Sequence, residues 1–195
     1  MTPSLQSTVR PALVLFAALT VLTGIAYPLA VTGIGQGAFA HEASGSLIVR
    51  DGRVVGSSLI GQAFSDPKHF WGRPSATAPM PNNGSASGGS NLGPLNPALT
   101  DAVKGRIEAL RAADPGHAAP VPIDLVTASA SGLDPHISVA AARFQAARVA
   151  RLRGVPLARV DQLIEQHTEG RLFGLLGEPR INVLLLNIAL ELAAR

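Results

Sequence analysis

The pattern of hydrophobic and polar positions divides this chain into an apolar amino-terminal stretch and a mixed body. No charged residue occurs from Pro11 to Phe39, and the apolar core of this stretch is Leu13–Ile34. A helix over these positions, rising about 1.5 Å per residue, is about 33 Å long and crosses a hydrocarbon layer about 30 Å thick. The pattern therefore predicts a transmembrane helix at residues 11–35, after a short amino-terminal segment at 1–10.

The body, residues 36–195, has the pattern of one compact α+β domain with a small β-sheet and about four helices. Asp51-Gly52 lies between the apolar runs "LIV" and "VV" and predicts a β-hairpin within 46–61. Residues 64–97, rich in Gly, Pro, Ser and Asn, predict a long loop. The other predicted elements are helices at 97–113, 140–153, 155–167 and 181–195, a strand at 121–129, and an ordered loop at 168–180.

Two of the predicted helices carry clear end signals. Asn96-Pro97 supplies an N-cap residue followed by proline at the first helical position. Gly154 stands where the helix at 140–153 should end, because glycine adopts the left-handed conformation that closes many helices.

The stretch "TASASGLDPHIS", residues 127–138, contains the residue types of a serine hydrolase site. Ser129 or Ser131 could act as nucleophile with His136, which makes a membrane-anchored periplasmic serine hydrolase the alternative function. Neither serine lies in a G-x-S-x-G turn, and triad members are normally far apart in sequence. The interpretation that we favour is a strand end, a tight turn at Gly132 and a helix capped by Asp134 or Ser138.

Other candidate sites have weak signals. The run "GSASGGSNLGP" (84–94) lacks the G-K-[ST] of a phosphate-binding loop, and His167 and Glu169 have no third metal ligand at a recognisable spacing. We therefore predict no catalytic residue and no metal site. Five arginines lie between Asp134 and Asp161 with no acid among them: Arg143, Arg148, Arg151, Arg153 and Arg159. They predict a solvated face, or a face that contacts lipid headgroups or an acidic partner, so a free lipid- or anion-binding module is a third alternative.

Composition and charge predict where the chain is located in the cell. Charged residues make up 15% of the chain, against about 25% in typical soluble domains, which agrees with a membrane segment. The absence of cysteine excludes disulfides and thiolate metal sites. Arg10, the first charged residue, favours a cytoplasmic amino terminus and hence a body on the periplasmic side of the inner membrane. A cleaved signal peptide ending at "AFA" (38–40) is the alternative, although its apolar region is longer than usual.

A series of motifs resembles one family. In order along the chain they are "GSSLIGQAF", "FWGRPSA", "SGGSNLGPLNP", "DLVTASASGLDPHIS", "RVARLRG", "HTEGR" and "LGEPRINVLLLNIAL". Following an amino-terminal span, they resemble the C subunit of the Kdp potassium-transporting ATPase over nearly the whole chain. The resemblance implies a non-catalytic accessory subunit that stabilises the complex and raises the ATP affinity of its P-type ATPase subunit. It also implies three partners, namely that ATPase subunit, a potassium-translocating subunit and a small single-span subunit.

The resemblance also bears on cofactors and on individual residues. It implies no covalently bound cofactor, with ATP acting through the complex, and this chain lacks the D-K-T-G motif of aspartyl-phosphate chemistry. Gln145, in "RFQAARVA", matches a family glutamine that has been proposed to contact nucleotide. As hypotheses for partner contacts we add Thr23, Gly24 and Pro28, whose small or kinking side chains suit helix packing, and the loop residues Trp71, Arg73 and Asn91.

Overall fold

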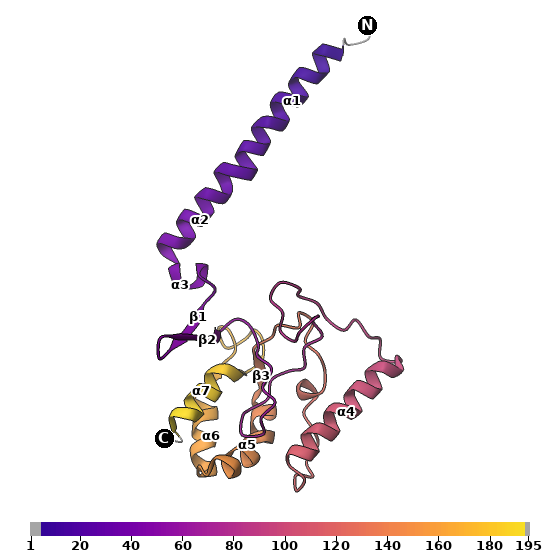
Figure 1. Cartoon of the computed structure of the whole chain (residues 1–195), viewed down its shortest axis with the longest axis vertical. Coiled ribbons are helices and arrows are strands. Elements are labelled where there is room, and N and C mark those ends of the chain that lie inside the picture. The colour runs from indigo at the N-terminus through magenta and orange to yellow at the C-terminus, as the bar shows by residue number, and fades with distance from the viewer. Residues whose placement is uncertain (1–4, 194–195) are drawn as a thin grey trace. The chain divides into compact units, whose positions relative to one another are not determined.

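The computed structural model describes residues 5–193, with side chains from residue 8, and forms two compact units (Figure 1). The first unit covers residues 1–47 and the second covers residues 48–195. The first holds one long helix, and the second is the α+β body predicted from the sequence.

The first unit confirms an apolar helix long enough to cross a membrane. It consists of α1 (Leu5–Val21), a π-helical turn η1 (Leu22–Ala26) and α2 (Tyr27–Ala38), followed by the short α3 (Ala40–Ala43). The ribbon runs through α1, η1 and α2 without a break (Figure 1). The most apolar 18-residue window of its stretch Thr8–Ala38 has a mean hydropathy of 2.1, and none of this window is buried within the protein. The helix is therefore a candidate span whose apolar surface is free to meet lipid.

Pro28 explains the π-helical turn. A proline within a helix lacks an N–H donor, and its ring clashes with the carbonyl four residues earlier, here that of Gly24. The turn at Leu22–Ala26 widens the helix at this point, and the Tyr27 N–H donates to the Leu22 carbonyl, five residues back. Such wide turns are rare and occur as single insertions in α-helices. We expected Pro28 to disturb the helix, and the structure has a π-helical turn at Leu22–Ala26, just before this proline.

The hairpin around Asp51-Gly52 is confirmed. Strands β1 (Leu47–Arg50) and β2 (Arg53–Ser57) form a two-stranded sheet. Asp51 has a φ of 50° and Gly52 a φ of 75°. Two consecutive positive φ angles define the type I′ turn, whose twist matches that of the flanking strands.

The core of the body forms around a second, three-stranded sheet and the helices α4 (Pro97–Ala113), α5 (Val139–Arg153), α6 (Leu157–Gln166) and α7 (Val183–Ala193). Strands β3 (His136–Ser138), β5 (Arg180–Asn182) and β4 (Thr168–Glu169) are antiparallel and adjacent in that order. Ile181 of the central strand pairs with Ile137 on one side and Thr168 on the other. The two isoleucines are buried with the inner faces of α5, α6 and α7.

The predicted helix ends are confirmed by their hydrogen bonds. The Asn96 side chain accepts a hydrogen bond from the Ala98 amide at 3.0 Å, and the Ser138 hydroxyl accepts one from the Ala141 amide at 3.0 Å. Gly154 ends α5 with a φ of 66°. Of the two candidates for the cap of α5, the structure therefore selects Ser138.

Three parts of the local prediction were wrong. Residues 121–129 contain a single 3₁₀ turn, η2 (Ile123–Leu125), and no strand. Pro120 and Pro122 remove two backbone donors that a sheet would need, and the Asp124 carboxylate instead accepts a hydrogen bond from the Ser138 amide at 2.7 Å. The strand near Gly132 lies after this turn, as β3, and not before it. The segment 168–180, predicted as a loop throughout, begins and ends in strands β4 and β5.

A candidate interaction surface seated on residues 129–138

The long loop between β2 and α4, residues 58–96, contains no helix or strand and is seated on the segment 129–134. Backbone carbonyl groups of this segment accept hydrogen bonds from the loop. The amides of Gly61 and Gly88 donate to the carbonyls of Leu133 and Ser131, at 2.8 and 2.9 Å. The Ser75 hydroxyl donates to the Gly132 carbonyl at 2.7 Å. These bonds satisfy backbone groups that an irregular segment would otherwise leave without partners.

Glycines make this close approach possible. A Cβ atom on Gly132 would lie 2.6 Å from Thr77 Cγ2 and 2.7 Å from the Gly88 carbonyl oxygen. A Cβ on Gly89 would lie 2.8 Å from the Ala130 carbonyl oxygen, and one on Gly61 would lie 2.7 Å from that of Asp134. Loop and segment therefore meet backbone to backbone, with no space for side chains. The stretch that resembled a hydrolase site serves as the seat of the loop.

A second attachment fixes the loop at Trp71. The Trp71 amide donates to Gln145 Oε1 at 2.8 Å, and Gln145 Nε2 donates to the Trp71 carbonyl at 3.1 Å. Arg148 Nη2 donates to the same Gln145 oxygen at 2.7 Å, and its guanidinium lies 4.9 Å from the centre of the Trp71 ring. Arg148 Nη1 also donates to the Pro67 carbonyl. Burial lowers the pKa of Arg148 to about 10, which still leaves it protonated at neutral pH.

The neighbouring Phe70 is held in the same way by Asn187 of α7. The Phe70 amide donates to Asn187 Oδ1 at 2.8 Å, and Asn187 Nδ2 donates to the Phe70 carbonyl at 3.0 Å. The Phe70 side chain is completely buried. Two buried amide side chains, on α5 and α7, thus form hydrogen bonds with the backbone of two consecutive loop residues. The role of Asn187 could not be predicted from the sequence, because an asparagine within the apolar "VLLLNIAL" belongs to no recognisable motif.

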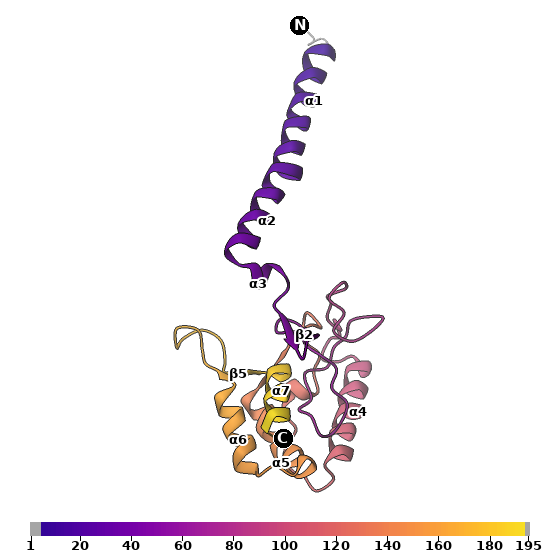
Figure 2. The ribbon, with the colours of Figure 1, turned by 60° about the vertical axis from the view of Figure 1, so that its left-hand side comes forward.

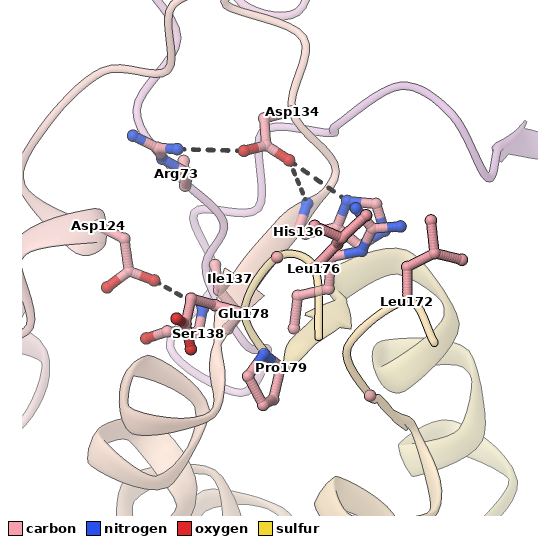
Figure 3. A pocket seen from close by; sticks show the side chains of 13 residues that line it. Arg73, Asp124, Asp134, His136, Ile137, Ser138, Leu172, Leu176, Glu178 and Pro179 are labelled. Carbon is pink, nitrogen blue, oxygen red and sulfur yellow. Dashed lines mark hydrogen bonds and ion pairs between the residues drawn. The ribbon is translucent and has the colours of Figure 1, made fainter. Parts of the chain in front are cut away.

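Asp134 is the third attachment and lines a pocket of about 370 Å³ between β3 and the loop at 170–179 (Figure 3). Its Oδ2 accepts from Arg73 at 3.1 Å, and its Oδ1 accepts from the His136 amide at 3.0 Å, with His136 Nδ1 at 3.4 Å (Figure 3). Burial alone would raise the pKa of Asp134, but the hydrogen bonds from His136 and Arg73 outweigh it and lower the pKa to about 2.

This shift predicts a loss of stability in acid. The pKa of Asp134 is lowered from 3.8 to about 2 by folding, so its contribution is complete above about pH 5 and is lost as the pH falls through 2. Because the side chain is 29% exposed, we expect Asp134→Asn to cost about 1–2 kcal/mol at pH 7. Urea unfolding at pH 7 and pH 2 should show the difference between variant and parent shrinking in acid. The matched variant Glu178→Gln, at an exposed carboxylate, should show little effect, and a difference for Asp134→Asn that is unchanged at pH 2 would contradict this account.

The His136 ring lies between two carboxylates. Its ring nitrogens face the carboxylates of Asp134, at 3.4 Å, and Glu169, at 3.8 Å. The Ser131 hydroxyl accepts a hydrogen bond from the Leu133 amide at 3.1 Å and so serves the turn. Within residues 5–193, no group of three or more His, Asp or Glu side chains could hold a metal ion. The polar residues of this region form hydrogen bonds with the long loop and with one another.

The predicted site residues fall into separate groups. Thr23, Gly24 and Pro28 lie on the long helix, where the Thr23 hydroxyl donates to the Leu19 carbonyl at 2.7 Å. Trp71 and Arg73 belong to the attachments described above. Asn91 is exposed on the loop with a φ of 51°. Gln145 is 1% exposed, and hydrogen bonds within the protein occupy both lone pairs of its oxygen and both of its N–H groups.

The predicted arginine face exists only in part. Arg143 is exposed, as a solvated face requires, but Arg148 is 2% exposed and binds the loop. Arg151 pairs with the buried Asp114 at 2.8 Å, and Arg153 Nε donates to the Lys68 carbonyl at 2.7 Å. The expectation of a solvated face was therefore wrong for Arg148, whereas Arg143, Arg151 and Arg159 are exposed and Arg153 is partly buried. The spacing of the arginines does not show which of them bind other parts of the protein, because the groups that they bind come from distant parts of the chain.

The chain thus combines one apolar helix, a candidate membrane span, with an α+β body whose polar side chains hold its own long loop. Residues 9–192 match the family described as "KdpC: K+-transporting ATPase, c chain", and the chain belongs to this family. Two similar relatives are the potassium-transporting ATPase KdpC subunits of Polaromonas naphthalenivorans and Variovorax paradoxus. They are 72% and 70% identical to this chain, covering 96% and 97% of it and 95% and 98% of their own lengths. The resemblance drawn from the motifs is confirmed.

Proposed function

We propose that this chain is the accessory subunit of a high-affinity, ATP-driven potassium-uptake complex. In this role it stabilises the assembly and raises the ATP affinity of the P-type ATPase subunit. The observation that carries the proposal is the family match over residues 9–192, together with relatives of the same length that are named as subunits of a potassium-transporting ATPase. The proposed partners are a potassium-translocating subunit, the ATPase subunit and a small single-span subunit.

We propose that the helix Thr8–Ala38 crosses the inner membrane once, with its amino terminus in the cytoplasm. Arg10 precedes the apolar stretch, and positive charge beside a first span favours the cytoplasmic side. The body, residues 48–195, then lies in the periplasm. There it can cover the entry side of the potassium-translocating subunit.

This topology makes the effect on ATP indirect. A periplasmic body does not meet cytoplasmic ATP, and the amide of Gln145 is already fully engaged by Trp71, Arg148 and Ala141. The nucleotide contact of Gln145 that the resemblance implies stays a prediction. We favour a coupling through the assembly, which for typical allosteric systems changes affinity by about 5–150-fold.

Two groups of residues are the proposed partner contacts. In the span, Thr23 and Gly24 present a small surface within the π-helical turn, where another helix can approach closely. In the loop, Asn91 gives the clearest test of a partner contact, because its side chain is exposed. Trp71 and Arg73 also hold the loop in place, so their substitution would alter both the loop and any contact that it makes.

The test is affinity purification of the tagged chain from membranes in mild detergent. We expect a P-type ATPase subunit and a potassium-translocating subunit to co-purify, and the complex to need more ATP for half-maximal hydrolysis when this chain is omitted, by about 5–150-fold. An Asn91→Ala variant should reduce the yield of the complex without changing the thermal stability of the isolated chain. Recovery of the chain without any ATPase subunit would overturn the proposal.

A further inference from the structure

The loop between β4 and β5 has an apolar tip that the core does not cover. Four large side chains within five residues are strongly exposed: Leu172 at 61%, Phe173 at 87%, Leu175 at 81% and Leu176 at 62%. Single exposed apolar residues are common on soluble proteins, whereas a contiguous group marks a surface that meets another apolar phase. Figure 2 shows this loop projecting from the body beside β5.

The backbone holds the tip in one shape. Leu172 and Leu176 form a bridge in which each amide donates to the carbonyl of the other, at 2.9 and 3.0 Å. Phe173 has a φ of 53° and Gly174 a φ of 74°. A positive φ is uncommon for a bulky residue such as phenylalanine and persists where the surrounding structure enforces it. The small hairpin thus directs the Phe173 ring outward.

Charges are confined to the base of this loop. Arg171 pairs with Glu178 at 2.8 Å, and Arg180 pairs with Glu169 at 2.9 Å. The residues between, 172–177, carry no charge. A neutral, wholly apolar tip above a ring of paired charges suits insertion into lipid, because it presents no ion to the hydrocarbon and keeps the charged groups at headgroup level.

The tip lies at the end of the body where the chain arrives from the long helix. Asn182 Nδ2, in β5 at the base of the loop, donates to the Ser58 carbonyl just after β2 at 2.8 Å. Both views show the β1–β2 hairpin and the loop at the same end of this unit (Figures 1 and 2). Residues 39–46 connect α2 to β1 and span at most about 30 Å when extended. A membrane that holds the long helix is therefore within reach of this end of the body.

We propose that Leu172, Phe173, Leu175 and Leu176 insert into the boundary between headgroups and acyl chains of the membrane that the chain spans. The tip is then a second, reversible membrane contact that restrains the body against the bilayer. This inference rests on the proposal that the long helix is an uncleaved span. Its occupant is lipid, since nothing at the tip offers the hydrogen bonds or charges by which a polar protein surface would be selected.

The absence of native cysteine makes the test direct. Phe173→Cys, labelled with bimane, would be measured in the full-length chain reconstituted into vesicles of phosphatidylglycerol and phosphatidylcholine with or without doxyl-labelled acyl chains. The control is Leu95→Cys, at a loop residue that is 96% exposed. We expect a blue-shifted emission and quenching by doxyl lipid that is several-fold stronger at 173 than at 95. Because both leaflets carry the same lipids, the orientation of the chain does not affect the comparison.

Two results would overturn the proposal. A label at 173 that is quenched by aqueous iodide as strongly as the one at 95, and not by doxyl lipid, would show a tip in water. A label that leaves water only when the other subunits are present would show that the tip enters a protein pocket. Either result is separable from the proposed function, because co-purification of the ATPase subunit with both cysteine variants measures that independently.

Discussion

Replacing Gln145 with leucine should lower the free energy of unfolding of the body by about 3–5 kcal/mol. Leucine has a similar volume, but it leaves the Trp71 amide, the Trp71 carbonyl and one N–H of Arg148 without their partner in a site that is 1% exposed. A buried polar group without a partner costs about 1–3 kcal/mol. Thermal or urea unfolding of the full-length chain in detergent measures the loss.

A matched substitution tests whether burial is the reason. Gln166 lies exposed at the end of α6, and Gln166→Leu makes the same chemical change there. We expect that variant to stay within about 0.5 kcal/mol of the parent. If Gln145→Leu unfolds like the parent and only the effect of the subunit on ATP affinity disappears, the holding role is wrong and the nucleotide contact gains support.

Replacing Gly132 with alanine should cost about 2–5 kcal/mol and release the long loop from its seat. Two penalties combine at this position. Its φ of 67° is unfavourable for alanine by about 1–2 kcal/mol. The added Cβ would also lie 2.6 Å from Thr77 and 2.7 Å from the Gly88 carbonyl, so the loop must move.

Gly154→Ala separates the two penalties. Gly154 has nearly the same φ, 66°, but a Cβ there would meet nothing within 4 Å. We therefore expect Gly154→Ala to lose only about 1–2 kcal/mol. Limited proteolysis should cut the loop at 75–90 faster in Gly132→Ala and leave it protected in Gly154→Ala. Equal stability loss and equal protection in the two variants would contradict the close approach of loop and segment.

Both variants concern the same structural property. The loop has no helix or strand of its own, so its shape depends on the backbone of residues 129–134 and on the side chains of Gln145, Arg148 and Asn187. If partner subunits contact the loop, as we propose, substitutions in the seat should weaken assembly without touching the partner. This gives a physical route from buried residues to function.

Features set by local interactions could be predicted from the sequence. The apolar span follows from composition over some twenty residues, and the hairpin turn follows from Asp51-Gly52, where φ is positive at both positions. The Asn96 cap and the Gly154 stop were also predicted correctly. In each case the partners of an interaction lie within a few positions of one another, so their spacing alone carries the information.

Features set by distant contacts could not be predicted in this way. In sequence, Arg148 resembles its solvated neighbours. It is buried only because Pro67 and Trp71, from the distant loop, pack against it in the folded chain. The strand predicted at 121–129 failed partly for a local reason, because Pro120 and Pro122 remove backbone donors, and partly because Asp124 accepts a hydrogen bond from Ser138, 14 residues later. The sequence by itself determined an α+β member of this family with one candidate span. The tertiary structure alone decided that residues 129–134 seat a loop, because close backbone packing and buried hydrogen bonds depend on which distant segments meet.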